Sequence, residues 1–350
     1  MRIMAMKVDE LPNTPQDINT IFEGIESKRT KFSNKIFRAD QVQISSTKYL
    51  IKNWFGYEGL SLVYGSSGAG KTLLALDLGF HVASGVEWFG NRVNRGNVVY
   101  IMSEGTNVSH NRIKAIEIKK NELFSEGAHY FHCLNDIVAL YSDSNDTLDF
   151  LKTVKHCFPR LVVIDTLAMA MSGGDENRTQ DIGIVLKNMK KIQQELGCHV
   201  MVLHHPGKDE SRGARGSSAL HAASDTVLEL KKSKDVVCVR AVKQRDMEGD
   251  KELNFKIEKV VIGEDEDGDE VSSAIIQKSG PTLGTKQEDI LNIILSHKDN
   301  GISQTQILSR LSDEGKTSFQ SNVSRDLAKL EERKCIHKLN NSYFPISKNQ

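Results

Sequence analysis

Short runs of apolar and β-branched residues alternate with amphipathic stretches from Leu60 to about residue 205. The runs LSLVY, NVVYIM, HYFHCL, LVVID and HVMVLHH predict strands. Helical spacing between these runs predicts helices at 72–83, 108–120, 147–156 and 179–196. Alternating strands and helices favour an α/β fold with a mostly parallel sheet covered on both faces.

The pattern changes after Ser224, where several strand-like runs follow one another without intervening helices. These runs are DTVLEL, VVCVRAVKQR, LNFKIEKVVI and VSSAIIQK, and they predict an antiparallel extension of the sheet. The acidic stretch GEDEDGDE at 263–270 lies between two of them. We interpret it as a solvated hairpin tip rather than a metal site.

Breaks in the pattern divide the chain into three parts. Residues 1 to about 55 show little periodicity, so we expect an N-terminal arm over 1–40 and the main α/β domain over 41–280. Glycine and proline at 278–285 mark the next boundary. Helices expected at 287–296, 304–311 and 319–333, followed by two strands around Asn340 and Asn341, make 285–350 similar to a winged helix-turn-helix.

Composition excludes some classes of protein. The 350 residues carry 46 Lys and Arg against 46 Asp and Glu, so any affinity for nucleic acid must come from local patches. The five cysteines are far apart and form no CxxC pair, which argues against a disulfide framework and a zinc site. No apolar run approaches the roughly 18 residues of a membrane span, and the start does not read as a signal peptide. We therefore expect a cytoplasmic protein with no membrane partner.

One segment carries a strong phosphate-binding motif. It follows an apolar strand and opens a helix, which is the context that this motif requires. Its glycines allow backbone N–H groups to surround phosphates, its lysine reaches the β- and γ-phosphates, and its threonine offers a hydroxyl to Mg²⁺. The sequence thus predicts ATP and Mg²⁺ as cofactors. The eight residues are Gly65, Ser66, Ser67, Gly68, Ala69, Gly70, Lys71 and Thr72.

Polar residues end three of the predicted strands, at the edge where α/β sheets bind their ligands. Asp165 ends LVVID and is a candidate acid for the magnesium site. Glu104 follows the strand NVVYIM and is the candidate base that activates water. His204 and His205 end HVMVLHH, and either of them is a candidate sensor of the γ-phosphate.

The order of motifs GSSGAGKT, IMSEG, VVIDT, VLHHPGKDESRGARGSSAL and VKQRD resembles RecA-like ring ATPases. It is most similar to the phage and plasmid group around the RepA hexameric replicative helicase, with kinship to DnaB-type helicases. The resemblance covers roughly residues 40 to 260. It implies that Glu104 is the catalytic base, Asp165 the magnesium-side acid, and His204 or His205 the sensor. It also implies that Lys243 and Arg245 reach the nucleotide of a neighbouring subunit, in a homo-oligomer that we expect to be a hexamer.

This sequence differs from RepA at one functional position. At two loops the resemblance also implies contacts with DNA. The arginine finger of RepA falls on or near Asp225 here, so the finger role rests on the KQRD segment alone. In RecA-like rings the loops corresponding to 169–180 and 206–217 line the central channel. The second loop has basic residues suited to phosphate contacts with single-stranded DNA, namely Lys208, Arg212 and Arg215.

These features lead to two hypotheses for the function. The first is an ATP-hydrolysing ring motor on single-stranded DNA, a DNA helicase of phage or plasmid replication. The alternative is an ATP-gated DNA-binding regulator or loader, or a recombination mediator, without helicase activity. In either case the C-terminal module contacts duplex DNA or a replication protein. Asn322 and Arg325, near the start of its third helix, are candidate DNA contacts. A small-molecule kinase would explain neither KQRD nor the channel loops.

Overall fold

The structure is a computed structural model that describes residues 38–41, 48–103, 106–141, 145–205, 218–245, 247, 249, 251–280, 285–313 and 320–346. Contacts divide the chain into the units Met1–Thr47 and Lys48–Gln350. The described part of the first unit contains the short helix η2 at Ala39–Gln41, and the second unit contains all the other described elements.

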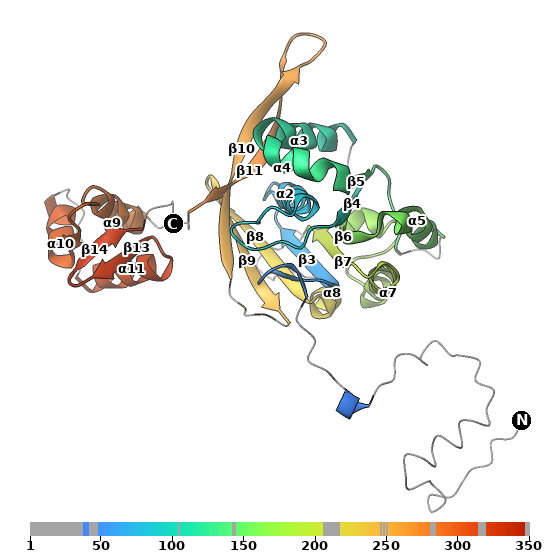
Figure 1. The fold of residues 1–350 in the computed structure, drawn as a ribbon, viewed down its shortest axis with the longest axis horizontal. Coiled ribbons are helices and arrows are strands. Elements are labelled where there is room, and N and C mark those ends of the chain that lie inside the picture. Colours follow the sequence, from blue (N-terminus) through green and yellow to red (C-terminus); the bar gives the residue numbers. More distant parts are fainter. Residues whose placement is uncertain are drawn as a thin grey trace, which may run out of the picture. The chain divides into compact units, whose positions relative to one another are not determined.

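The large sheet has nine strands in the described residues, in the order β11-β10-β9-β8-β3-β7-β6-β4-β5 (Figure 1). Strands from β8 to β5 in this order pair in parallel, whereas β9, β10 and β11 are added as antiparallel neighbours of β8 and of one another. The expected α/β class, a mostly parallel sheet with an antiparallel extension, is confirmed. The strands are β3 (Gly59–Gly65), β4 (Asn97–Met102), β5 (Phe131–Leu134), β6 (Pro159–Asp165), β7 (His199–His204), β8 (Thr226–Ser233), β9 (Val236–Gln244), β10 (Glu252–Glu264) and β11 (Glu270–Ser279).

Helices cover both faces of this sheet, as expected for parallel strands that are buried on both sides. One core forms between the sheet and α2, α3 and α4, and it includes Leu74, Phe80 and Ile116. The other forms under α5 and α7, and it includes Phe150 and Val185. The helices are α2 (Lys71–Ser84), α3 (Thr106–Lys119), α4 (Asn121–Gly127), η3 (Ala128–Tyr130), α5 (Asp146–Val154), η4 (Lys155–Cys157), α6 (Leu167–Ala170), α7 (Thr179–Leu196) and α8 (Ser218–Ala223).

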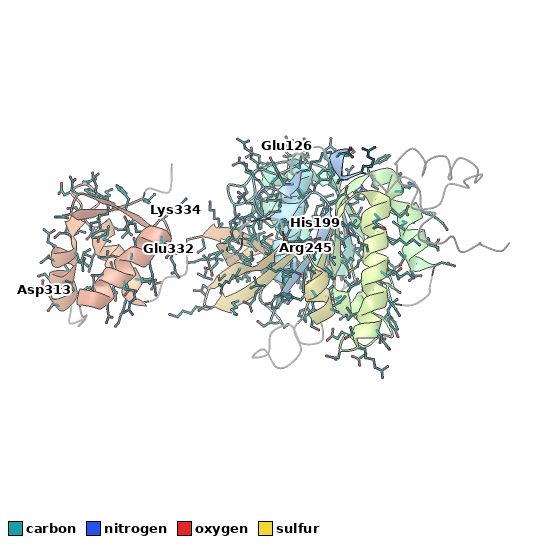
Figure 2. The ribbon with its side chains drawn as sticks, turned by 90° about the horizontal axis from the view of Figure 1, so that it is seen from below. Glu126, His199, Arg245, Asp313, Glu332 and Lys334 are labelled. Carbon is teal, nitrogen blue, oxygen red and sulfur yellow. The ribbon has the colours of Figure 1, made fainter. Side chains whose placement is uncertain are left out.

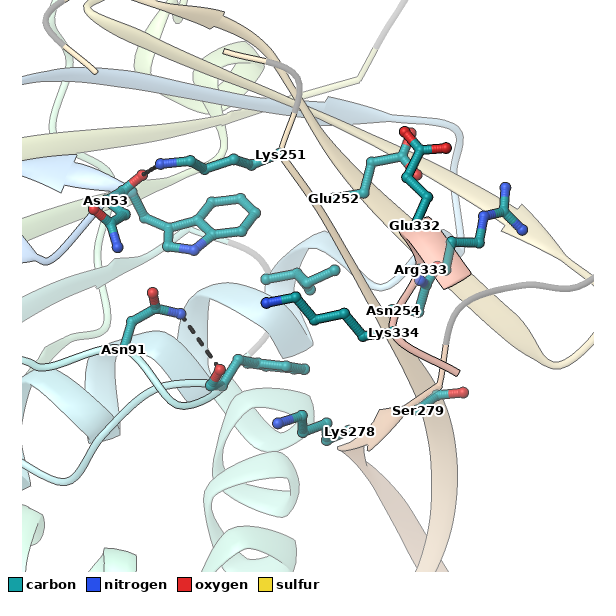
Figure 3. Close-up of a pocket in the computed structure, with 13 residues that line it drawn as sticks. Asn53, Asn91, Lys251, Glu252, Asn254, Lys278, Ser279, Glu332, Arg333 and Lys334 are labelled. Carbon is teal, nitrogen blue, oxygen red and sulfur yellow. Dashed lines mark hydrogen bonds between the residues drawn. The ribbon is translucent and has the colours of Figure 1, made fainter. Parts of the chain in front are cut away.

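A small hairpin precedes β3, in a stretch that the sequence pattern left without structure up to about residue 55. Its strands are β1 (Tyr49–Ile51) and β2 (Phe55–Gly56), and Phe55 is fully buried. The Trp54 and Trp88 rings meet edge to face at 5.5 Å. Figure 3 shows two nearby contacts: Lys251 Nζ donates to Asn53 O at 3.4 Å, and the Asn91 amide donates to Phe89 O at 3.4 Å. The hairpin is therefore part of the folded core.

The C-terminal residues form a module with its own core, in which Ile294, Leu327 and Leu330 are fully or almost fully buried. The three helices and the two strands around Asn340 and Asn341 are present, and the sequence pattern missed the short strand β12. Its sheet has the order β12-β14-β13. The elements are α9 (Thr285–Leu295), β12 (Ile302–Ser303), α10 (Gln304–Asp313), α11 (Gln320–Glu332), β13 (Ile336–Leu339) and β14 (Ser342–Pro345).

The interpretation of the acidic stretch at 263–270 as the tip of a hairpin is confirmed. Strands β10 and β11 pair from Asn254 with Ser279 out to Glu264 with Glu270. Asp265 Oδ1 accepts the backbone N–H groups of Asp267 and Asp269 and so shapes the turn. In the described part of the chain, no helix has the length and apolarity needed to cross a bilayer.

Candidate nucleotide site

The phosphate loop connects β3, a fully buried central strand, to helix α2. Gly68 and Gly70 have φ angles of 73° and 87°, which lie in the left-handed region that favours glycine. A Cβ on Gly70 would also lie 3.3 Å from the Phe255 ring and from Ile257 Cδ1 on β10. The loop therefore needs glycine here both for its backbone conformation and for its packing against the antiparallel extension.

Lys71 is the first residue of α2, and only 4% of it is exposed. Its ammonium group donates to Gly65 O at 2.7 Å and to Ser66 O at 3.0 Å. Its Nζ also lies 3.0 Å from His205 Nδ1. The lysine is thus held over the mouth of the loop by carbonyls that precede it in the motif.

Asp165 ends β6 and is 5% exposed. Its Oδ2 accepts a hydrogen bond of 2.8 Å from the Tyr100 hydroxyl on the neighbouring strand β4. The pKa of Tyr100 is raised well above its ordinary value, first because the side chain is buried and next because of the charge on Asp165. Tyr100 therefore remains a hydrogen-bond donor that fixes the orientation of the carboxylate. The sequence pattern gave no reason to single out this tyrosine, because NVVYIM reads as an ordinary buried strand.

The two histidines at the end of β7 face opposite sides of the sheet, as neighbours on a strand do. His205 contacts Lys71 and lines the phosphate cavity. His204 is 1% exposed, and its Nδ1 lies 3.8 Å from Glu176 Oε2. Its pKa is lowered to about 4, first by burial and then by the charges of His205 and Lys71. Of the two candidate sensors, His205 is the one on the phosphate side.

A cavity of about 210 Å³ lies at the phosphate loop. Two lining residues that are distant from the motif in sequence were not anticipated, namely Arg112 on α3 and Ile257 on β10. Neither belongs to a motif, and both reach the loop only because α3 and the β10–β11 hairpin pack beside α2. The remaining lining residues are Ser67, Gly68, Gly70, Lys71, Thr72, Leu73 and His205.

Lys243 and Arg245 lie together, but far from this cavity. Lys243 Nζ donates to the carbonyls of His221 and Ala222 at 2.9 and 2.8 Å, at the end of α8. Arg245, labelled in Figure 2, pairs through Nη1 with Asp225 Oδ1 at 2.6 Å. Each cation thus has partners within its own chain.

Strand register gives the separation between this pair and the phosphate loop. Gly65 pairs with Leu230 on β8, whereas Ser61 pairs with Thr226, which in turn pairs with Gln244 on β9. Gln244, between the two cations in sequence, therefore lies at the level of Ser61, about 13 Å along the strands from the loop. The pair therefore lies toward the amino-terminal end of β3, whereas the phosphate loop follows the carboxyl end of β3. In this sense the pair is at the sheet edge opposite its own phosphate loop.

Some candidate residues lie outside the described residues. They are Glu104, and Lys208, Arg212 and Arg215 of the second channel loop. Asn322 and Arg325 are described on α11, where Arg325 is exposed. Their roles stay predictions.

The residues present fit a nucleotide with magnesium. The loop, Lys71 and the helix N-terminus suit phosphates. Thr72 lines the cavity, and Asp165 is a buried carboxylate one strand beyond β7. Mg²⁺ takes few protein ligands and draws the others from phosphates and water. The described residues contain no group of three or more His, Cys, Asp or Glu side chains that could hold a metal ion. Thr72 and Asp165 would hold the ion when it is bound.

The loop, its lysine and the carboxylate at the end of a neighbouring parallel strand define a P-loop ATPase domain. The AAA domain family matches residues 26–211, more than half of the chain, so this chain belongs to that family. Among solved structures, the chain is similar to the crystal structure of the RadB recombinase at 19% sequence identity and a TM-score of 0.42, covering 58% of this chain and 89% of that chain. At this level the likeness carries no functional argument.

Proposed function

We propose that this protein is an ATP-hydrolysing ring motor that binds single-stranded DNA, a hexameric replicative DNA helicase of the phage and plasmid type. The observation that carries the proposal is the position of Lys243 and Arg245 at the sheet edge opposite their own phosphate loop. A cation there does not reach the nucleotide of its own subunit. Subunits arranged head to tail in a ring would bring it to the next one.

The charges beside Arg245 are consistent with a role at a subunit interface. Arg245 is exposed, and its Asp225 partner also accepts the Leu60 backbone N–H at 2.9 Å. Asp225 is thus anchored to β3 and presents Arg245 at the surface. In the neighbouring subunit such an arginine would stabilise the charge that develops on the γ-phosphate.

Hydrolysis in this proposal divides among residues of the chain. Bound Mg²⁺ would neutralise charge on the β- and γ-phosphates. Lys71 binds the phosphates, Asp165 stands on the magnesium side with Tyr100 fixing its orientation, and Glu104 removes the proton from water. His205, which contacts Lys71, senses the γ-phosphate.

DNA binding is assigned to the two loops at the sheet edge that carries the phosphate site. Segment 169–180 begins within α6, which directly follows β6, and loop 206–217 follows β7. Both therefore begin beyond the carboxyl ends of neighbouring parallel strands, of which β7 pairs with β3 and β6 pairs with β7. Lys208, Arg212 and Arg215 would contact DNA phosphates without reading sequence.

The C-terminal module supports the alternative function. It has a separate core and a helix α11 whose first turns carry Asn322 and the exposed Arg325. If it is a winged helix that reads duplex DNA, the ATPase would serve as a switch for assembly in a loader, a regulator or a recombination mediator.

Turnover and mass in solution distinguish these functions. The full chain is measured with ATP and Mg²⁺, with and without single-stranded or duplex DNA, for ATPase rate, assembly mass and strand displacement. A helicase shows hexameric mass, stimulation by single strands and displacement. Slow, unstimulated turnover with duplex-specific binding would replace the helicase with the alternative.

A second experiment tests the DNA path. Changing Lys208, Arg212 and Arg215 together to Ala is expected to weaken single-strand binding and to flatten its salt dependence, because fewer counterions are released. A matched control changes three exposed lysines elsewhere, Lys152, Lys231 and Lys259, to Ala. If both triple variants have the same salt slope, the DNA path does not run through loop 206–217.

A further inference from the structure

Arg112 is a second cationic side chain, besides Lys71, that lines the cavity at the phosphate loop, and no motif includes it. It lies on α3 and lines the same cavity as Lys71, Thr72 and His205. Helix α3 packs along the β10–β11 hairpin, whose Ile257 forms another part of the wall. Packing against this hairpin therefore positions the helix that carries Arg112 beside the cavity.

The charge of Arg112 acts on the magnesium side of the site. Arg112 lines the same cavity as Thr72, whose hydroxyl would hold Mg²⁺. The guanidinium therefore lies within a range at which its charge acts on a phosphate bound beside that hydroxyl. This side of the loop is where the terminal phosphate of a bound triphosphate meets the magnesium ligands.

Within the described part of the chain, Arg112 also differs from other cations of α3 in having no anionic partner. Lys114 pairs with Glu117 at 2.8 Å, and Lys119 pairs with Glu258 at 3.2 Å, both from the same helix. Among the described residues, Arg112 makes no hydrogen bond or ion pair. A partly buried guanidinium without a counter-charge is costly, so the cavity is suited to an anion that supplies one.

We propose that Arg112 binds the γ-phosphate of the nucleotide held by the phosphate loop of its own subunit. The inference rests on the proposed ATP site and adds a cation in cis to it. A guanidinium offers a planar pair of N–H donors that fits two oxygens of one phosphate. ADP has no γ-phosphate, so Arg112 distinguishes ATP from ADP. Arg245 has a different role, because it acts on the nucleotide of the neighbouring subunit.

The test compares two nucleotides in two variants. Binding of ADP and of a non-hydrolysable ATP analogue is measured with Mg²⁺ for the full chain, Arg112→Gln and Arg112→Lys. Arg112→Gln is expected to weaken analogue binding about 10- to 100-fold, as for one lost charge-assisted hydrogen-bonding group, and ADP binding by less than about twofold. Arg112→Lys keeps the charge but loses the planar pair of N–H donors, so its affinity for the analogue lies between those of the wild type and Arg112→Gln. Lys114→Gln, on the same helix, changes neither affinity.

The outcomes separate this inference from the proposed function. A wild-type chain that binds neither nucleotide overturns the ATP site itself. If the wild type binds both and Arg112→Gln binds both as tightly, only the role of Arg112 fails. Equal weakening for ADP and the analogue in both variants also overturns it, because the contact would then not be to the γ-phosphate. Melting temperatures of the variants identify any loss that comes from unfolding.

Mixed assemblies test whether Arg112 acts in its own subunit. Arg112→Gln chains are mixed with Lys71→Ala chains, and ATPase activity is followed across the mixing ratio. If Arg112 and Lys71 serve the site of their own chain, every site in the mixture lacks one of them, and mixing does not restore ATPase activity. Partial rescue would mean that Arg112 serves a neighbour, and the assignment in cis would be wrong.

Discussion

His205 Nδ1 lies 3.0 Å from Lys71 Nζ, although 134 positions separate the two residues in sequence. An ammonium group only donates hydrogen bonds, so this contact requires an imidazole whose Nδ1 is free of a proton. This side-chain hydrogen bond joins the end of β7 to the phosphate loop, in addition to the pairing of β7 with β3. In the proposed function, phosphate oxygens would compete for the same ammonium, and His205 would then lose or change this partner in response to nucleotide.

Lys71→Ala is expected to abolish nucleotide binding or hydrolysis, because it removes the side-chain cation of the loop itself. Binding is measured with a fluorescent nucleotide, and turnover by phosphate release. Lys152→Ala, at an exposed ion pair on α5, serves as the control and should behave as wild type. Normal turnover in Lys71→Ala would remove the ATPase assignment of this site.

Glu104→Gln is expected to bind ATP normally and to lose turnover. The amide has the shape of the carboxylate but does not accept a proton from water. Equilibrium binding and single-turnover hydrolysis, measured on the same preparation, separate the two effects. If the variant turns over at the wild-type rate, the base must be sought elsewhere in the chain.

Arg245→Ala is expected to leave ATP affinity largely intact and to lower hydrolysis, by at most the roughly 10³–10⁵-fold range of arginine fingers. Mixing it with Lys71→Ala should partly restore activity. At a mixed interface one chain supplies Arg245 and the other supplies the intact loop. ATPase activity across mixing ratios is the measurement. Strictly additive activities in subunits shown to exchange would argue against a ring.

Asp77→Asn is expected to lower the free energy of unfolding by about 2–3 kcal/mol. Asp77 is buried on α2, accepts the Trp88 indole N–H at 3.2 Å and pairs with Lys120. Urea denaturation of the wild type and the variant checks this value. Asp149→Asn, which removes an exposed pair with Lys152, should change stability by less than about 0.5 kcal/mol. Equal effects of the two variants would show that the buried pair is not stabilising.

The stability of the fold is expected to fall between about pH 6.5 and pH 4 because of His199. This residue, labelled in Figure 2, lies between Gly56 O at 3.0 Å and Ser61 Oγ at 2.9 Å. Burial lowers its pKa to about 4, against the weaker opposing effects of the Gly56 carbonyl and Asp225. The unfolded chain binds a proton near pH 6.5, where the folded chain does not. Stability is therefore complete above that pH and is lost as the pH falls, by up to about 3 kcal/mol from this residue.

The measurement is the unfolding free energy of wild type, His199→Gln and His129→Gln at several pH values. His199→Gln should reduce the dependence and leave the part that comes from His204, whose pKa is also lowered to about 4, whereas His129→Gln, at an exposed position, should leave it unchanged. If the unfolding free energy of His199→Gln depends on pH as steeply as that of the wild type, other groups cause the dependence.

Local signals explain which features could be predicted from the sequence. The strand LVVID ending in Asp165 and the loop ending in Lys71 and Thr72 depend on contiguous residues, and the structure has both where expected. Arg112 depends instead on how α3 packs beside the loop, and a mixed polar helix gives no sign of which of its cations will face a cavity. The partners of Asp77 were missed for the same reason, since Trp88 and Lys120 come from separate elements.

The two histidines show an intermediate case. Alternation along a strand dictates that His204 and His205 face opposite sides, but not which side carries the loop. The packing of α2, the helix that begins at Lys71, decides which face of the sheet carries the loop. The hairpin around Trp54 escaped detection because its strands are too short for a periodic pattern.

The position of β3 in the sheet also determines when the nucleotide site becomes complete. The partners of β3 are β7, which begins at His199, and β8, which begins at Thr226. Chains are synthesised from the amino terminus, and pairing between distant segments is slow. The predicted phosphate loop is therefore among the first parts of the domain to be made and among the last to be enclosed, so we expect nascent chains shorter than about 230 residues to lack nucleotide affinity.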